Sequence, residues 1–213
     1  MVGIKRISKK EKSCYRPSDI WDKKDISVFL KYCPNKRDKC YYSIAFDTSG
    51  RPHELWSLRI KGIKFCRTEN NKQFVEVRIS DGKTGSRIVV LIDSIPFLKE
   101  WLLEHPHSTN PDAYIFITKN GCKLTYDGLA SRCKYYEKVY FPSIIDENST
   151  IVTDGADKAI TRNLVTKKWN IYVLRHSALT KKVNILESKF LSHAGWTAAS
   201  KMPQVYTSKW RIE

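Results

Sequence analysis

The last third of the chain contains an arginine, an indole and a phenol in an order that suits phosphodiester chemistry. Arg175 stands in the sequence Leu-Arg-His-Ser, Trp196 follows a glycine, and Tyr206 ends the sequence Met-Pro-Gln-Val-Tyr. A tyrosine can attack phosphorus if a neighbour takes its proton, because the pKa of a phenol is ordinarily about 10. Arginine can bind the non-bridging phosphate oxygens in bidentate fashion. The order therefore suggests chemistry through a tyrosine nucleophile.

Two further basic residues complete the set that this chemistry needs. Arg51 follows Gly50 and offers a second phosphate clamp, while Lys83 lies in the sequence Asp-Gly-Lys-Thr-Gly. A glycine-rich stretch between two strand patterns predicts a hairpin turn. A lysine presented there can protonate the departing 5′-oxygen as a general acid. These steps need no metal ion, and the sequence has no carboxylate or His/Cys cluster at metal-ligand spacing, so we expect no cofactor and no metal.

Four segments resemble the sequence boxes of the tyrosine recombinase (phage integrase) family. They are residues 49–55, 83–87, 172–177 and 196–206. They come in the family's order and at similar intervals, and the resemblance extends over roughly residues 18–206, which corresponds to the family's catalytic domain. The Gly-Trp step and the Met-Pro run near the end are also similar to those of some archaeal integrases.

The resemblance implies a role for each candidate residue. Arg51 and Arg175 would be the paired phosphate clamps, and Lys83 would be the general acid. Tyr206 would be the nucleophile that forms a 3′-phosphotyrosyl link. Taken singly, each residue has an ordinary structural explanation, such as a helix-capping or surface arginine, a solvated turn lysine or a half-buried aromatic ring. Their joint occurrence favours the functional interpretation.

Two positions depart from the family's commonest pattern. Tyr172 stands where a histidine is often found, and a phenol is a poor base near neutral pH, so the proton acceptor for Tyr206 is left open. Trp196 lies at the family's usual interval before Tyr206, whereas His193 lies farther away. We therefore expect the indole N–H of Trp196 to donate to the phosphate, with His193 as the alternative.

Other residues in or near these boxes could support the site. Glu54 could orient either clamp arginine, or could simply be an acid favoured near a helix start. His176 is expected to brace the site rather than to transfer a proton. Arg87 and Lys119 could contact phosphate groups or could be solvated surface charges.

The hypothesis that the resemblance favours is a site-specific DNA recombinase or integrase. Such an enzyme would cleave and rejoin double-stranded DNA, here for the integration or excision of a mobile element. The alternatives are a non-catalytic DNA-binding relative and a type IB topoisomerase-like enzyme that relaxes strands. The resemblance also implies self-association on DNA as a tetrameric synapse, a monomer when free, and a cytoplasmic, nucleoid-associated location in a prokaryotic or viral setting.

Composition favours a nucleic-acid partner. The 38 Lys and Arg residues exceed the 22 Asp and Glu residues, which gives a net charge of +16. Such an excess attracts polyanions and releases counterions from nucleic acid. The longest aliphatic run, residues 88–92, is far too short to cross a bilayer, so we expect no membrane association. The six cysteines include no C-x-x-C pair, which predicts reduced core thiols.

These side chains need a fold that brings them together. The resemblance implies an α+β fold, mainly helical, with a small antiparallel β-sheet on one edge. Apolar residues at helical spacing predict helices after Asp22 and over residues 37–47, 95–104 and 126–136, and a further helix at Pro52. Alternating patterns predict strands over residues 59–66, 73–80, 86–92 and 114–118, and residues 141–170 are predicted to be a long loop with one short helix. Residues 1–17 are interpreted as a basic arm or linker, and residues 18–213 as the catalytic domain.

Overall fold

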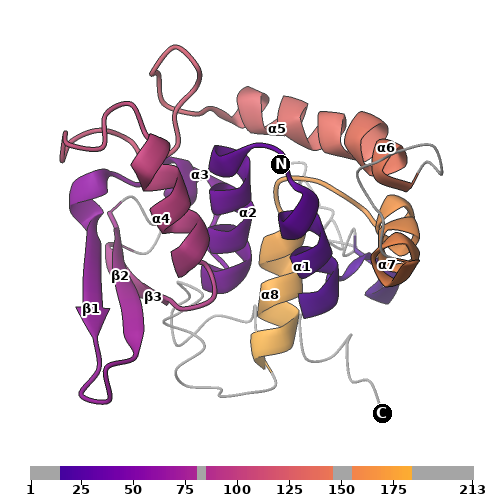
Figure 1. The fold of residues 1–213 in the computed structure, drawn as a ribbon, viewed down its shortest axis with the longest axis horizontal. Helices are drawn as coiled ribbons and strands as arrows, with labels where there is room; N and C mark the ends of the chain where they lie inside the picture. The colour runs from indigo at the N-terminus through magenta and orange to yellow at the C-terminus, as the bar shows by residue number, and fades with distance from the viewer. Residues whose placement is uncertain (1–14, 81–84, 146–154, 184–213) are drawn as a thin grey trace, which may run out of the picture.

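Helices form most of the molecule, and a small sheet lies at one edge (Figure 1). The computed structural model describes residues 15–80, 85–145 and 155–183. Its helices are α1 (Lys23–Tyr32), α2 (Lys36–Thr48), α3 (Pro52–Trp56), α4 (Ile95–Glu104), α5 (Tyr126–Tyr135), α6 (Phe141–Ile145), α7 (Gly155–Thr166) and α8 (Val173–Val183). Short 3-10 turns cover Pro17–Asp19 and Ile60–Gly62, and a π-helical turn covers Tyr136–Tyr140. The expected α+β class is confirmed.

The sheet consists of three antiparallel strands in the order β1–β2–β3. These strands are β1 (Ile63–Arg67), β2 (Gln73–Ile79) and β3 (Arg87–Leu91). Val77 of the central strand pairs with Ile63 on one side and Val89 on the other. Alternate valine, isoleucine and leucine side chains of β2 and β3 are buried, as expected for strands with one face on the core. The antiparallel pairing of β2 with β3 confirms the strand pair predicted around residues 81–84, which themselves lie outside the described residues.

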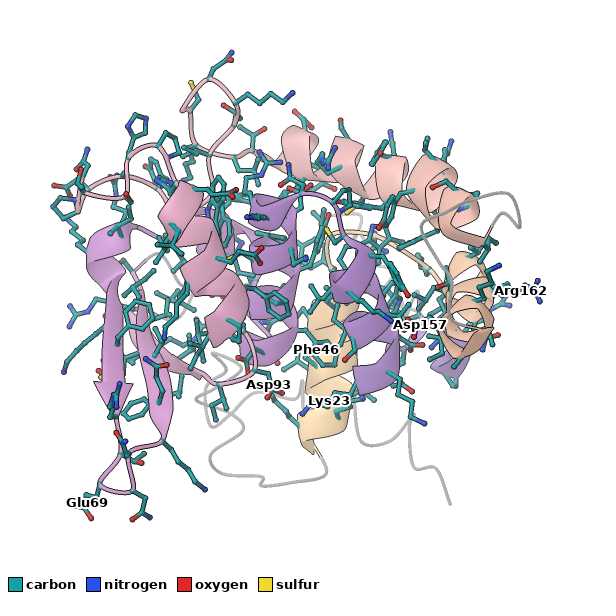
Figure 2. All side chains as sticks on the ribbon, in the orientation of Figure 1. Lys23, Phe46, Glu69, Asp93, Asp157 and Arg162 are labelled. Atoms are coloured by element: carbon teal, nitrogen blue, oxygen red, sulfur yellow. The ribbon has the colours of Figure 1, made fainter. Side chains whose placement is uncertain are left out.

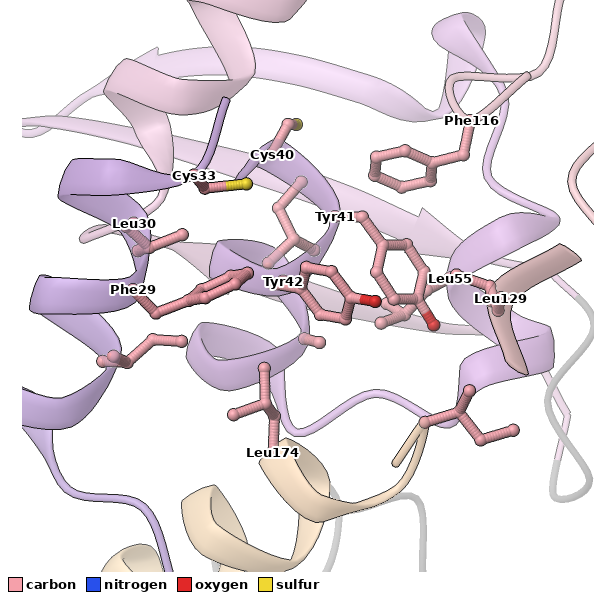
Figure 3. Packing of buried hydrophobic residues seen from close by; sticks show 14 of the residues in the cluster. Phe29, Leu30, Cys33, Cys40, Tyr41, Tyr42, Leu55, Phe116, Leu129 and Leu174 are labelled. Carbon is pink, nitrogen blue, oxygen red and sulfur yellow. The ribbon is translucent and has the colours of Figure 1, made fainter. Parts of the chain in front are cut away.

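Helix α2 lies at the centre of the core (Figure 3). Tyr42 packs edge-on against Phe29 of α1, with ring centroids 5.3 Å apart, and Tyr41 packs edge-on against Phe116 at 5.2 Å. Leu174 of α8 belongs to the same buried cluster. Aromatic pairs in this arrangement stabilise a core by about 0.5–1.5 kcal/mol each beyond the area that they bury. The ends of α2 and α8 are therefore held in a fixed relation to each other.

The start of α1 follows the sequence signal. The carboxylate of Asp22 accepts hydrogen bonds from the backbone N–H groups of Lys24 and Asp25, at 2.6 and 2.8 Å. The carboxylate of Asp25 in turn accepts from the backbone N–H of Asp22 at 2.7 Å, which completes a capping box. The predicted cap at Asp22 is confirmed.

Three sequence-based predictions of secondary structure were wrong in part. The strand predicted over residues 59–66 begins only at Ile63, because residues 60–62 form a 3-10 turn. Residues 114–118 form no regular strand and make only the isolated bridges Arg59↔Tyr114 and Ile117↔Lys123. The region 141–170 is not mainly a loop, because it contains α6 and the twelve-residue helix α7.

Contacts with α1 explain why α7 forms although its sequence pattern is weak. Only Thr161 and Leu164 of α7 are buried, so the helix has a narrow apolar face. Asp157, in the first turn of α7 (Figure 2), accepts a hydrogen bond from the hydroxyl of Tyr32 at 2.7 Å and pairs with Lys31. Short helices draw most of their stability from such tertiary contacts rather than from intrinsic propensity.

The five described cysteines are all free thiols, but they are not all in the core. Cys33, Cys40 and Cys133 are buried, Cys66 is partly buried and Cys122 is exposed. The expectation of core thiols was therefore wrong for Cys122, and Cys14 lies outside the described residues. Within the described ranges, no helix combines the length and the apolar character needed to cross a membrane.

Candidate phosphate-binding site

The junction between α2 and α3 is shaped by a left-handed residue and a glycine. Ser49 ends α2 with a φ of 56°, in the left-handed region. At Gly50, an added Cβ would lie 2.5 Å from Cδ2 of Leu55, so the backbone can approach Leu55 this closely only without a side chain. Pro52 then occupies the first turn of α3, where its missing N–H costs nothing. This sharp turn places Arg51 at the N-cap of α3.

Arg51 is held by its own helix. Its backbone N–H donates to Oε2 of Glu54 at 2.8 Å, and its Nη1 donates to Oε1 of the same carboxylate at 2.9 Å. The Arg51 side chain is 17% exposed, whereas that of Glu54 is fully buried. Of the possible roles for Glu54, the structure therefore places it against Arg51.

Arg175 approaches the same junction from α8. It lies in the first turn of α8, is 7% exposed, and its Nη1 donates to the backbone carbonyl of Ser49. Ser49 and Arg175 are 126 positions apart in the sequence. The hydroxyl of Ser49 is buried and finds no hydrogen-bond partner among the described residues. The two arginine segments thus meet at one place, as a bidentate phosphate clamp would require.

A third arginine reaches the site from the sheet. Arg87, the first residue of β3, donates from Nη1 and Nη2 to the two carboxylate oxygens of Glu54, at 2.8 and 2.7 Å. Burial raises the pKa of Glu54, but the hydrogen bonds and charges of Arg87 and Arg51 outweigh it and lower that pKa to about 2. Glu54 is therefore ionised. The sequence suggested Arg87 as a phosphate contact and gave no sign of this carboxylate partner, because the spacing of the two residues is not local.

The N-terminus of α8 is fixed by the side chain of Asn170. Its Oδ1 accepts from the backbone N–H of Tyr172 at 2.9 Å and from the hydroxyl of Tyr15 at 2.8 Å. Asn170 thus forms an Asx turn just before α8 and also fastens Tyr15, which lies far away in the sequence. Tyr172 itself is 39% exposed, so its phenol lies at the surface beside the site.

His176 packs against Tyr15, with ring centroids 4.2 Å apart. Burial, together with the charges of Arg175 and Lys168, lowers the pKa of His176 to about 4. The imidazole is therefore neutral near pH 7. Its position on Tyr15 suits the bracing role expected of it.

The C-terminal part of α8 is tied to the end of α2. The Nζ of Lys182 donates to the backbone carbonyl of Asp47, and burial lowers the pKa of Lys182. The carboxylate of Asp47 accepts from the backbone N–H groups of Ile92 and Ser94, at 2.9 and 3.1 Å. Asp47 therefore connects α2 and α8 with the segment that leaves β3.

Only part of the predicted site falls in the described residues. Arg175 donates to the Ser49 carbonyl, two residues before Arg51, and Tyr172 lies three residues before Arg175, next to the start of α8. Lys83, Trp196 and Tyr206 lie outside the described ranges, as does His193. The described residues contain no cluster of three or more His, Cys, Asp or Glu side chains that could hold a metal ion. Lys119 lies on an exposed turn, well apart in the sequence from the arginine segments.

The fold is shared with solved structures of DNA recombinases and integrases. A post-cleavage complex of the XerH site-specific recombinase with a palindromic difH substrate matches with a TM-score of 0.61 at 20% identity, over 91% of this chain and 50% of that one. The XerA recombinase matches with a TM-score of 0.59 at 17% identity, over 92% and 61% of the two chains. The Tn1549 transposon integrase with circular intermediate DNA matches with a TM-score of 0.56 at 14% identity, over 91% and 62%.

These matches establish a shared fold, and the chain spans between half and about three fifths of the length of the proteins it matches. No family model matches the sequence. No curated protein matches it either.

Proposed function

We propose that this protein breaks and rejoins DNA strands through a tyrosine nucleophile, as a site-specific recombinase. The observation that carries the proposal is the convergence of two arginine segments on one turn, where Arg175 donates to the Ser49 carbonyl next to the Arg51 segment. Two arginines that act together on the non-bridging oxygens suit a phosphodiester, whose transition state gains negative charge. The shared fold with recombinase and integrase structures supports the same conclusion.

In the proposed reaction, the phenol of Tyr206 gives its proton to solvent water, its oxygen attacks the phosphorus, and the bond to the 5′-oxygen breaks. Arg51 and Arg175 neutralise the non-bridging oxygens, and Trp196 donates its indole N–H to one of them. Lys83 gives its proton to the departing 5′-oxygen, which leaves as a hydroxyl. Rejoining is the reverse attack of a 5′-hydroxyl on the 3′-phosphotyrosyl bond, which restores the free tyrosine.

Tyr172 would take the place of a family histidine next to the phosphate. Its phenol is 39% exposed at the start of α8 and can donate a hydrogen bond to a phosphate oxygen. An aqueous phenol is too weak a base to take the proton of Tyr206 near pH 7. Tyr172 therefore serves as a phosphate donor in this scheme.

The partner is double-stranded DNA, to which the net charge of +16 is suited. The structures that share the fold include complexes with difH DNA and with a transposon's circular intermediate. On this support we further propose that the process served is the integration or excision of a mobile element, carried out by several copies of the chain assembled on DNA.

A nicked suicide substrate tests the chemistry without knowledge of the target sequence. The full chain is incubated with a pool of duplexes that carry a nick within randomised bases, so that cleavage releases a short fragment and prevents rejoining. Adducts that survive denaturation are isolated, digested and sequenced. We expect an adduct at a restricted set of sequences, formed with added chelator.

Three variants and two outcomes make this experiment decisive. Tyr206→Phe and Arg175→Gln should abolish the adduct, whereas Tyr126→Phe, at an exposed position of α5, should leave it intact. Duplex binding with no adduct from the wild-type chain would identify a non-catalytic DNA-binding relative. Adducts with relaxation of supercoiled plasmid but no strand exchange between duplexes would identify a topoisomerase-like enzyme.

A further inference from the structure

Glu54 is shared between arginines from two different elements. Its Oε1 accepts from Nη1 of both Arg51 and Arg87, and its Oε2 accepts from Nη2 of Arg87 and from the backbone N–H of Arg51. The contact with Arg87 is a fork with two parallel bonds, whereas the contact with the Arg51 side chain is a single bond. Arg87 is therefore the stronger side-chain partner of Glu54.

This sharing matters because one carboxylate faces two guanidiniums in a buried place. The Glu54 side chain is fully buried, and those of Arg87 and Arg51 are 12% and 17% exposed. Opposite charges interact more strongly there than in water. Without Arg87, Arg51 alone would balance the negative charge of Glu54. The Arg51–Glu54 pair would then carry no net charge and would attract an anion more weakly. With Arg87 present, the three side chains together keep a net positive charge.

The guanidinium of Arg87 is directed at Glu54. Both of its terminal nitrogens are directed at the Glu54 carboxylate, at 2.8 and 2.7 Å. Its Nε is buried and finds no hydrogen-bond partner in the described part of the chain. A guanidinium held by this fork is placed to act on a bound phosphate through Glu54 and Arg51.

We propose that Arg87 is a positioning residue of the phosphate site, which takes up the charge of Glu54 so that Arg51 can bind a phosphodiester. Arg87, the first residue of β3, also ties the end of the β2–β3 strand pair where it faces Ile79 to α3. The inference rests on the proposed function for the class of ligand, a phosphodiester, but not for strand cleavage.

The test measures binding of dimethyl phosphate, a phosphodiester that keeps a single negative charge over the pH range used. The full chain and its variants are titrated by NMR at constant ionic strength. Arg87→Gln should weaken binding by about tenfold, because Glu54 then neutralises Arg51. The double variant Glu54→Gln/Arg87→Gln should recover to within about threefold of the wild type. Arg78→Gln, at an exposed position of β2, is the matched control and should change nothing.

The affinity for dimethyl phosphate, measured at several pH values, distinguishes the positioning role from a merely structural one. Loss of Arg87 should raise the pKa of Glu54 from its low value, so the affinity of Arg87→Gln should recover as Glu54 takes up a proton below about pH 5. Neither the wild-type chain nor the double variant should show this recovery. A double variant that binds no better than Arg87→Gln would overturn the proposal and identify Arg87 as a direct phosphate ligand.

A second substitution keeps the proposal open to refutation if Arg87→Gln does not fold. Arg87→Lys retains the positive charge beside Glu54 but not the two-bond fork, so it should bind dimethyl phosphate more weakly than the wild type and more tightly than Arg51→Gln. A loss as large as that caused by Arg51→Gln would contradict the proposal. These experiments measure binding alone. The positioning role can therefore be refuted while the suicide-substrate assay still gives an adduct, and it can be supported when that assay gives none.

Discussion

The guanidinium of Arg175 donates a hydrogen bond to the backbone carbonyl of Ser49, two residues before Arg51. This bond joins the first turn of α8 to the left-handed end of α2, so the position of one arginine segment depends on the other. The carbonyl is a fixed acceptor, and the Arg175 side chain is nearly buried, which limits the rotamers open to it. For the proposed phosphodiester ligand, such a fixed position would mean that Arg175 needs little rearrangement on binding.

The first prediction concerns the geometry of Arg175. Arg175→Lys keeps the positive charge but cannot hold the Ser49 carbonyl and a phosphate oxygen at once with a planar fork. We expect adduct formation on the suicide substrate to slow by about 10²-fold or more. Arg78→Lys, at an exposed position of the sheet, should react at the wild-type rate. A wild-type rate for Arg175→Lys would show that charge alone suffices at this position.

The second prediction concerns the glycine that lets the α2–α3 turn close. Gly50→Ala should lower the free energy of unfolding by about 1–3 kcal/mol, because the new Cβ would lie 2.5 Å from the Leu55 side chain in a packed interior. Urea unfolding measures this change. Gly155→Ala, where no atom lies within 4 Å of an added Cβ, is the matched control and should cause no loss. Equal losses in the two variants would mean that the close approach to Leu55 is not what requires glycine.

A third prediction concerns a buried ionic cluster that joins α2 to α5. Asp38 is 3% exposed and its carboxylate pairs with Arg37 and Arg132, at 2.7 and 2.6 Å, and accepts from the hydroxyl of Tyr136 at 3.0 Å. Asp38→Ala should lower the free energy of unfolding by about 3 kcal/mol, because it leaves two guanidiniums without their shared anion.

Thermal and urea unfolding of Asp38→Ala and of a control variant, Asp112→Ala, distinguish the effect of removing a buried carboxylate from that of removing an exposed one. Asp112→Ala removes an exposed carboxylate that pairs with Lys61 at 2.6 Å, and it should leave the unfolding curve nearly unchanged. If Asp38→Ala behaved in the same way, the cluster would not be a source of stability.

The sequence was informative where structure is local. The cap at Asp22, the span of α2 and the pairing of β2 with β3 all follow from neighbouring residues, and the structure confirms them. Helix α7 was missed because its stability comes from contacts with α1, through Asp157 and Tyr32, rather than from its own pattern. Local patterns cannot report such distant partners.

In the candidate site too, the sequence predicted some features and could not predict others. The resemblance of their segments to family boxes predicted Arg51 and Arg175 as a pair of phosphate clamps, and this role stays a prediction. It left the partner of Glu54 open and suggested a phosphate contact for Arg87, because their bidentate contact joins residues 33 positions apart on different elements. Nor could the sequence show that Tyr15, in the expected arm or linker, packs on His176.

The last prediction uses this contact between Tyr15 and His176. Burial and the charges of Arg175 and Lys168 lower the pKa of His176 from 6.5 to about 4 in the folded protein. Between these values the unfolded chain takes up a proton at this position and the folded chain does not. The contribution of His176 to stability is therefore full above about pH 6.5 and falls as the pH drops towards 4, by on the order of 3 kcal/mol in total.

His176→Phe keeps a ring against Tyr15 but removes the titrating group. The stability of the wild-type chain relative to this variant should therefore decrease as the pH is lowered from 7 to about 4.5, as measured by urea unfolding at several pH values. All other titrating groups are common to the two chains and cancel in the difference, apart from small changes in groups close to the ring. A difference that stays constant with pH would mean that His176 takes up its proton equally well in the folded chain, and that its burial against Tyr15 does not hold it neutral.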